Sequence, residues 1–229
     1  MKIDTGGRTL ESMSQAIWYN KWTLKKFEKY LHGDILEVGC GIGNFTKELN
    51  KYGKVWAIDI SEAYIKQTSA LVGRRIGIGD IEKGKYFFKG KQFDCIVCLN
   101  VLEHIKDDKK ALKNIFNLLK DKGILILLVP IFDFLYGEID KSIGHLRRYE
   151  KNELQKMVKS LGFEIIKSRT INFLGAIGWW ISSRILSNNK IDESKIKLFN
   201  FIAPLVLRLE DLFEPAVGTS ILIIAKKNK

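Results

Sequence analysis

The chain has 229 residues, of which 46% are hydrophobic, so it can bury the core of one domain with appendages but not the cores of two full domains. Its formal net charge of +12 permits RNA, an acidic substrate or an anionic membrane surface as a partner. The lysines are spread in ones and twos, as at Lys25-Lys26, so a solvated lysine surface is the preferred explanation.

The N-terminal residues show no apolar run behind basic residues, and no apolar stretch of the sequence is long enough to span a bilayer. We therefore expect a cytoplasmic location. The three cysteines form neither an even disulfide framework nor a complete set of zinc ligands, and Cys95 and Cys98 lie on an apolar strand. We expect them in the core, and we expect no metal site.

Hydrophobic periodicity predicts an N-terminal helix over residues 13–31, followed by alternating strands and helices. The predicted strands are 35–39, 54–59, 74–79, 93–99, 123–129, 163–171 and 219–226, and the predicted helices between them are 43–51, 61–72, 107–120 and 151–161. Alternation of this kind predicts an α/β fold with a doubly wound, mostly parallel, seven-stranded sheet and helices on both faces. The carboxyl edge of such a sheet is where a ligand crevice is expected.

The first predicted strand runs into a turn with glycines at positions 39, 41 and 43. Glycines at this spacing let the backbone turn tightly and approach a ligand, while the N–H groups of the following helix attract an anion. Asp59 ends the next strand, at the spacing of a carboxylate that accepts hydrogen bonds from ribose hydroxyls. The two elements together predict an adenosine-type ligand. A dinucleotide fingerprint is a poor fit, because Asn44 stands where it requires a small residue.

The pattern Glu37-x-Gly39-x-Gly41-x-Gly43 resembles the first motif of the class I S-adenosylmethionine-dependent methyltransferases. Three later segments resemble further motifs of that family in the right order: Gly79-Asp80-Ile81, residues 93–105 and residues 118–126. The resemblance covers roughly residues 30–170. It implies a Rossmann-like fold, S-adenosyl-L-methionine as cofactor and S-adenosyl-L-homocysteine as product.

The same resemblance implies a set of cofactor-binding residues. The glycine turn would hold the methionine end, Asp59 the ribose, Asp80 the adenine amino group, and Ile81 would lie against the ring. Tyr19 is a weaker candidate, because an aromatic residue of the N-terminal helix either closes over the cofactor or packs on the core. The full set is Glu37, Gly39, Gly41, Asp59, Ile60, Asp80, Ile81, Asn100, Val101 and Tyr19.

We expect a single methyltransferase domain with four parts. These are an N-terminal helical cap (1–34), a cofactor-binding core (35–171), a helical insertion or lid (172–217) and a final strand (218–229). The insertion contains two strongly apolar stretches, 173–181 and 198–207. They either cover the sheet edge or, through residues 173–207, form an interfacial face for a lipid-like acceptor or a membrane surface.

Residues 136–149 are expected to form a loop after the fifth predicted core strand, where the family usually builds its acceptor pocket. His145 is the first candidate for a general base, because its ordinary pKa lies near neutrality, and His104 is the second. The alternative is a structural lattice in which His145 and Arg147 pair with Glu138 or Asp140. Residues 144–149, Gly-His-Leu-Arg-Arg-Tyr, also resemble a signature found in a branch of small-molecule methyltransferases.

Three functions remain open from the sequence. The leading hypothesis is methyl transfer to a small, hydrophobic or lipid-linked acceptor. The second is an RNA methyltransferase, which the charge permits, although Asn100-Val101-Leu102-Glu103 stands where a base-amine motif would be expected. The third is a non-catalytic protein that binds S-adenosylmethionine. The acceptor atom and the oligomeric state are not determined by the sequence.

Overall fold

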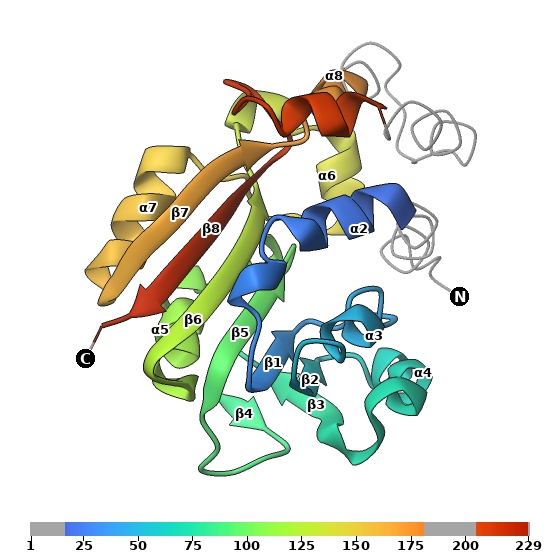
Figure 1. Cartoon of the computed structure of the whole chain (residues 1–229), viewed down its shortest axis with the longest axis vertical. Helices are drawn as coiled ribbons and strands as arrows, with labels where there is room; N and C mark the ends of the chain where they lie inside the picture. Colours follow the sequence, from blue (N-terminus) through green and yellow to red (C-terminus); the bar gives the residue numbers. More distant parts are fainter. Residues whose placement is uncertain (1–16, 181–204, 229) are drawn as a thin grey trace.

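The computed structural model describes residues 17–180 and 205–228, and every statement below concerns these ranges. They contain an eight-stranded sheet in the order β4-β3-β2-β1-β5-β6-β8-β7 (Figure 1). The strands are β1 (Asp34–Val38), β2 (Lys54–Asp59), β3 (Ile76–Asp80), β4 (Lys85–Tyr86), β5 (Phe93–Leu99), β6 (Leu119–Pro130), β7 (Phe163–Ile171) and β8 (Ser220–Lys227).

Strands β3, β2, β1, β5 and β6 are parallel neighbours, whereas β8 pairs antiparallel with both β6 and β7. The chain starts at β1, moves to β2 and β3 on one side, and then returns to β5 on the other side of β1. The strand order therefore reverses between β1 and β5. In open α/β sheets, this reversal opens a crevice at the carboxyl ends of the two strands.

The α-helices are α2 (Ile17–Lys25), α3 (Thr46–Leu49), α4 (Glu62–Val72), α5 (Asp108–Leu118), α6 (Glu138–Ile143), α7 (Lys151–Ser160) and α8 (Phe173–Trp180), and residues 205–210 are also helical. Short 3-10 turns lie at Glu28–Tyr30, Gly73–Arg75, Leu102–His104 and Asp133–Leu135. Two apolar clusters pack on the opposite faces of the sheet. One includes Leu112 of α5 and Leu154 of α7, and the other includes Leu24 of α2, Leu49 of α3 and Val72 of α4.

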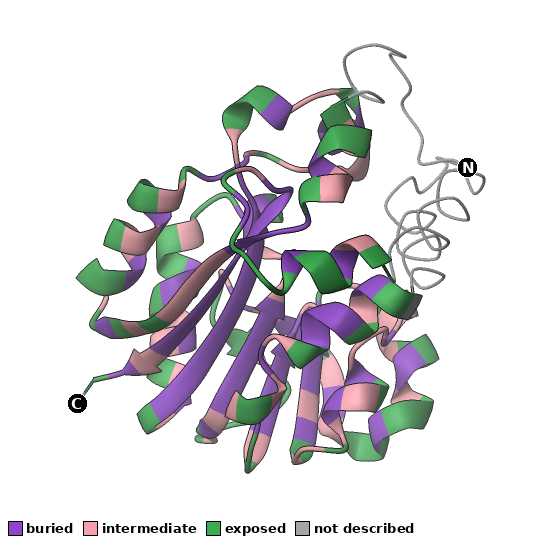
Figure 2. Cartoon of the chain, turned by 45° about the horizontal axis from the view of Figure 1, so that its top comes forward, coloured by how far each residue is buried: buried purple, intermediate pink, exposed green. Residues whose placement is uncertain are grey.

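Burial explains why the central strands read as nearly continuous apolar runs in the sequence. All of β8 except one residue is buried, as are five of the seven residues of β5 (Figure 2). A strand covered by helices on both faces has no solvent side that would require alternating polar residues. Cys40, Cys95 and Cys98 are free and buried, as expected of core residues.

The structure confirms the predicted α/β fold class and its mostly parallel sheet. The seven predicted strands are present, and the eighth, β4, is a two-residue edge strand that the sequence did not reveal. The segment expected to be a loop at 136–149 contains the short helix α6, so that expectation was wrong in part. Gly144, with φ 86°, ends this helix in the left-handed region, where a glycine carries no Cβ penalty.

Helices α2, α6 and α8 lie beside the same end of the sheet (Figure 1). Helix α2 contacts the helical residues 205–210 within the predicted insertion, because the Trp22 indole N–H donates to the carbonyl of Leu207 at 2.9 Å. The predictions for residues 1–16 and 181–204, including most of the second apolar stretch, lie outside the described residues. Within the described residues, none of the helices has the length and apolarity that a bilayer crossing requires.

Candidate cofactor and acceptor site

The glycine turn follows β1, at the point where the strand order reverses between β1 and β5. Gly39 and Gly41 have φ values of 71° and 51°, which glycine adopts without steric cost. A Cβ on Gly39 would lie 2.3 Å from Cγ2 of Val101, which follows β5. The predicted residues from both sides of the strand reversal are therefore in close contact, and only a glycine fits this approach.

Asp59 holds this turn by both carboxylate oxygens. Oδ2 accepts the backbone N–H of Gly41 at 2.9 Å, and Oδ1 accepts the N–H of Ser61 at 2.8 Å. The Asp59 side chain is buried beside the turn and is not directed into bulk water. A carboxylate has about four lone-pair sites, so both oxygens keep capacity for ribose hydroxyls.

Glu37 lies beneath the turn and accepts the Thr46 hydroxyl at 2.5 Å. Burial and the neighbouring Asp59 together raise the pKa of Glu37 to about 8, while the Thr46 hydrogen bond acts in the opposite direction. The sequence did not identify Thr46 as a partner, since it lies within an apparently ordinary helix start. A cationic group bound at the turn would lower the pKa of Glu37 and so favour its ionised form.

The candidates at the ends of β2 and β3 lie in different environments. Ile60 is 76% exposed, whereas Ile81 is buried against the core. Burial opposes ionisation of Asp80, but hydrogen bonds from the Lys83 side chain and backbone outweigh it and lower the pKa of Asp80. Asn100 is exposed and adopts a left-handed φ of 53°, which is uncommon for a residue with a side chain.

Tyr19 lies in the core between α2 and the sheet, with 6% of its surface exposed. Burial raises the pKa of its hydroxyl to about 12, and the polar groups near that hydroxyl include Thr23, Asn172 and Ser220. This position agrees with the packing alternative for Tyr19.

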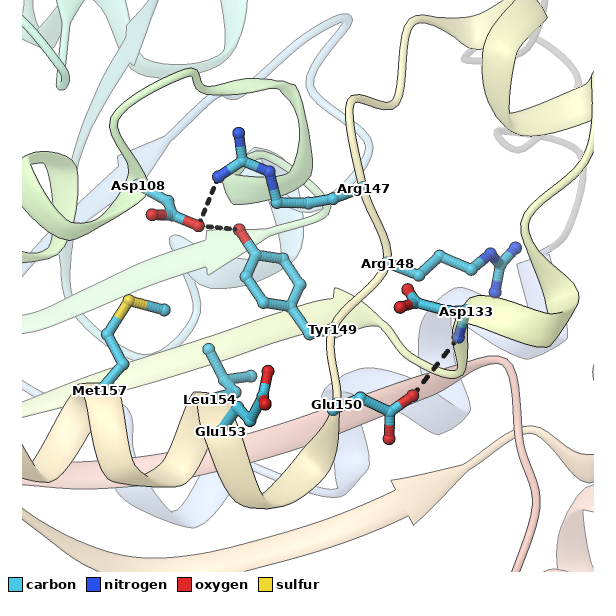
Figure 3. Close-up of a pocket in the computed structure, with 9 residues that line it drawn as sticks. All are labelled: Asp108, Asp133, Arg147, Arg148, Tyr149, Glu150, Glu153, Leu154 and Met157. Carbon is cyan, nitrogen blue, oxygen red and sulfur yellow. Dashed lines mark hydrogen bonds and ion pairs between the residues drawn. The ribbon is translucent and has the colours of Figure 1, made fainter.

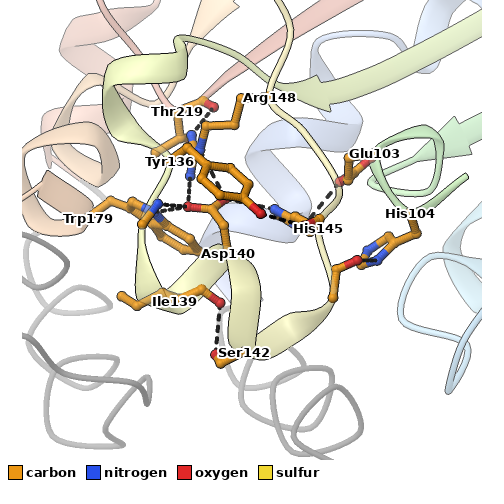
Figure 4. A network of polar contacts seen from close by, with 12 residues as sticks. Glu103, His104, Tyr136, Ile139, Asp140, Ser142, His145, Arg148, Trp179 and Thr219 are labelled. Atoms are coloured by element: carbon orange, nitrogen blue, oxygen red, sulfur yellow. Dashed lines mark hydrogen bonds and ion pairs between the residues drawn. The ribbon is translucent and has the colours of Figure 1, made fainter. Parts of the chain in front are cut away.

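A buried polar network organises the segment from α6 to Tyr149 (Figure 4). Asp140 is its centre, since Oδ1 pairs with His145 Nδ1 at 2.8 Å and with Arg148 Nε at 3.0 Å. Its Oδ2 accepts the Trp179 indole N–H at 3.1 Å. Burial opposes ionisation of Asp140, but the His145 hydrogen bond and Arg148 outweigh it and lower the pKa of this carboxyl.

This network contains part of the lattice that the sequence offered as an alternative. His145 pairs with Asp140, as that alternative allowed, but Arg147 pairs with Asp108 at 2.7 Å and Glu138 with Lys141 at 2.8 Å. The contribution of Trp179 was missed, because nothing in an apolar stretch indicates which indole N–H will find a buried acceptor.

His104 and His145, the two base candidates, lie beside one another with ring centroids 4.9 Å apart. Glu103 is fully buried next to them, and its Oε1 lies 3.7 Å from His145 Nε2. Burial lowers the pKa of His104, with a further contribution from His145. The sequence did not identify Glu103 as a partner of His145, because the two residues are 42 positions apart.

A separate pocket of about 310 Å³ lies between the 3-10 turn Asp133–Leu135, the segment 147–150 and helix α7 (Figure 3). None of the predicted cofactor residues lines it. Several of its charged groups are committed to one another, since Asp108 accepts from both Arg147 and the Tyr149 hydroxyl. Its lining residues are Asp108, Asp133, Arg147, Arg148, Tyr149, Glu150, Glu153, Leu154 and Met157.

Comparisons with known proteins identify a domain of a described family within this chain. Residues 36–127 match the family model described as a methyltransferase domain. An uncharacterised protein of Methanocaldococcus jannaschii is 33% identical over 154 residues, which cover 67% of this chain and 65% of that protein. The ubiquinone biosynthesis O-methyltransferase of Rickettsia bellii is 26% identical over 175 residues, covering 69% of this chain and 71% of that enzyme.

Solved structures share the fold. The N-methyltransferase NodS of Bradyrhizobium japonicum, in complex with S-adenosyl-L-homocysteine, matches with a TM-score of 0.58 at 16% identity, over 92% of this chain and 86% of NodS. Residues 36–127 thus match a methyltransferase domain, and the chain shares the fold of solved S-adenosylmethionine-dependent methyltransferases.

Proposed function

We propose that this methyltransferase is a cytoplasmic protein. It transfers the methyl group of S-adenosylmethionine to a small, hydrophobic or lipid-linked acceptor. The observation that carries the cofactor half of the proposal is the contact of Gly39 with Val101 at the strand reversal, with Asp59 buried beside it. The sulfonium activates the methyl group by itself. The protein must therefore hold the acceptor in line with the methyl–sulfur bond, which is a matter of proximity and orientation.

An apolar surface beside the carboxyl edge supports a hydrophobic acceptor. Helix α8 exposes large apolar side chains, and the segment 205–213 exposes more. The two are joined, because the Glu210 carboxylate accepts the backbone N–H groups of Asn172 and Phe173 at 2.6 and 2.9 Å. Exposed members of this apolar surface are Phe173, Ile177, Trp180, Leu205, Leu209, Leu212 and Phe213. The name of the Rickettsia bellii relative also refers to a lipid-like product, ubiquinone.

For a hydroxyl acceptor, His145 is the proposed general base. Its Nδ1 must carry the proton in the contact with Asp140, because an ionised carboxylate can only accept a hydrogen bond. The lone pair of Nε2 is then free to take a proton from the acceptor, with Asp140 stabilising the imidazolium. His104 is the second candidate.

The test combines methyl-labelled S-adenosylmethionine with separated lipid, small-molecule and RNA extracts, and measures which fraction gains label. The proposal predicts label in a lipid or apolar small-molecule fraction, and none with an Asp59→Ala control. Label confined to RNA would contradict the acceptor class. No label anywhere, with tight cofactor binding in the same sample, would support a non-catalytic binding protein instead.

A second experiment tests whether the apolar surface binds membranes, independently of cofactor binding. The double variant Ile177→Glu/Leu212→Glu should lose co-sedimentation with anionic vesicles while its cofactor affinity stays unchanged. Ile166→Glu is the matched control, since Ile166 is 44% exposed on β7 outside this surface. Equal vesicle binding by the wild type and the double variant would argue against a membrane contact.

A further inference from the structure

Glu103, His104 and His145 form a compact cluster beside the carboxyl end of β5 (Figure 4). One potential ligand atom from each residue lies within 4.8 Å of the other two. Glu103 and His104 belong to the 3-10 turn that follows β5, whereas His145 comes from the segment after α6. The fold therefore brings together two imidazoles and a carboxylate from two separate parts of the chain.

In both histidines, one ring nitrogen already has a hydrogen-bond partner. His145 Nδ1 contacts the Asp140 carboxylate at 2.8 Å, and His104 Nδ1 contacts the carbonyl of Gly144 at 3.1 Å. A carbonyl or an ionised carboxylate can only accept, so Nδ1 donates in each ring and Nε2 keeps its lone pair. A donor contact from Nδ1 to a carboxylate or carbonyl is the usual support of a metal-bound histidine.

Glu103 supplies an independent observation that points to a ligand. Its side chain is fully buried, and within the described residues neither carboxylate oxygen has a hydrogen-bond partner. Buried carboxyl groups are almost always hydrogen-bonded or bound to a metal, because desolvation without a partner is costly. The orphaned oxygens lie toward His145, with Oε1 at 3.7 Å from Nε2.

We propose that Glu103, His104 and His145 bind one divalent transition-metal ion through a carboxylate oxygen and two imidazole nitrogens. Two ligands at about 2.1 Å from a tetrahedral Zn²⁺ lie about 3.4 Å apart, close to the Glu103–His145 distance of 3.7 Å. His104 is the exposed member of the cluster, so an ion would enter past its ring. This inference departs from the sequence analysis, which expected no metal.

The electrostatic surroundings suit a cation. The Asp140 carboxylate and the Glu103 carboxyl, whose pKa burial raises to about 8, both lie at this cluster, and Arg148 is the neighbouring cation, already paired with Asp140 at 3.0 Å. Three protein ligands leave an open position for water or an acceptor oxygen. A bound ion would occupy the Nε2 lone pair of His145, so ligation and general-base action exclude one another at that atom.

The experiment measures metal binding directly, without cofactor or acceptor. Tag-free, metal-stripped full-length protein is titrated with Zn²⁺ in a calorimeter and with Co²⁺ in a spectrophotometer. The proposal predicts one equivalent of each ion and visible Co²⁺ bands of a nitrogen- and oxygen-ligated centre. Glu103→Gln and His145→Gln should each weaken Zn²⁺ binding by about tenfold or more.

His32→Gln and Glu138→Gln are the matched controls, because both residues are exposed and lie outside the cluster. They should bind Zn²⁺ like the wild type. Circular dichroism and thermal unfolding in EDTA show whether each variant is folded. Absence of a Zn²⁺ and Co²⁺ site in the wild type, or unchanged affinity in folded Glu103→Gln and His145→Gln proteins, would overturn the proposal. Because cofactor binding is measured separately, this failure would leave the proposed methyl transfer untouched.

Discussion

Replacing Asp59 by alanine should lower both the free energy of unfolding and the affinity for the cofactor. The two losses can be measured separately. The variant removes the acceptor of two backbone N–H groups, those of Gly41 and Ser61. The Gly41 hydrogen bond is buried, so its N–H would stay unpaired at a cost of about 1–3 kcal/mol. The Ser61 N–H is only partly buried and recovers water. A loss of about 1–3 kcal/mol corresponds to a melting temperature lower by about 2–12 °C for a chain of this size.

The loss of affinity should exceed the loss expected from destabilisation alone. Two hydrogen bonds from ribose hydroxyls to a carboxylate contribute about 1.5–3 kcal/mol each, so their removal should weaken S-adenosyl-L-homocysteine binding by about 100-fold or more. Calorimetric titration below the melting temperature of the variant measures this directly.

Asp94→Ala is the matched control for this variant. Asp94 accepts the backbone N–H of Asp34 at 2.8 Å and pairs with Lys120. It lies near the start of β5, at the amino ends of the parallel strands, whereas Asp59 lies at their carboxyl ends. Its removal should lower the melting temperature without affecting cofactor affinity. Unchanged cofactor affinity in Asp59→Ala, or an equal loss in both variants, would refute the assignment of the ribose contact.

Three further perturbations test other parts of the account. Gly39→Ala should abolish cofactor binding because its Cβ would meet Val101 at 2.3 Å, whereas Gly73→Ala, with φ 60° and open space, should cost about 1–2 kcal/mol of stability and leave binding intact. Equal cofactor affinity in the two glycine variants would show that the turn is not the site. The cofactor-free protein should lose unfolding free energy as the pH rises from 4.5 to about 8, because Glu37 keeps a proton that the unfolded chain releases, and urea titrations of Glu37→Gln should show a smaller loss. An identical pH profile in the variant would contradict the raised pKa. Asp140→Ala should lower the unfolding free energy by about 3–5 kcal/mol by leaving Arg148 buried without its partner, whereas Glu138→Ala on the same helix, which loses only an exposed pair, should stay within about 0.5 kcal/mol. Similar urea midpoints for both would rule out Asp140 as the centre of the network.

The sequence predicted the sheet well because the buried strands and the helical periods carry strong local signals. Strands β2, β5 and β7 were placed at their observed bounds, and β1 and β8 within one residue at each end. Strand β6 begins at Leu119, four residues earlier than predicted, because Leu119 to Lys122 continue the strand where a helix end and turn were expected. Strand β4 was missed because two residues carry no periodicity.

The candidate site was predictable only where a backbone requirement fixes the residue type. Gly39 must be glycine because Val101 approaches it, and this requirement is visible in the spacing of the turn. The environment of His145 was not predictable, because Glu103, Asp140 and Trp179 reach it or its partner from three different elements. Long-range polar contacts of this kind depend on how the helices pack, and a single sequence does not encode them locally.

The most direct test of the account is a crystal structure of the protein with S-adenosyl-L-homocysteine. We predict that the homocysteine portion lies over the turn from Gly39 to Gly43 and that both ribose hydroxyls donate to Asp59. A nucleoside bound elsewhere, or a ribose with no contact to Asp59, would contradict the central claim.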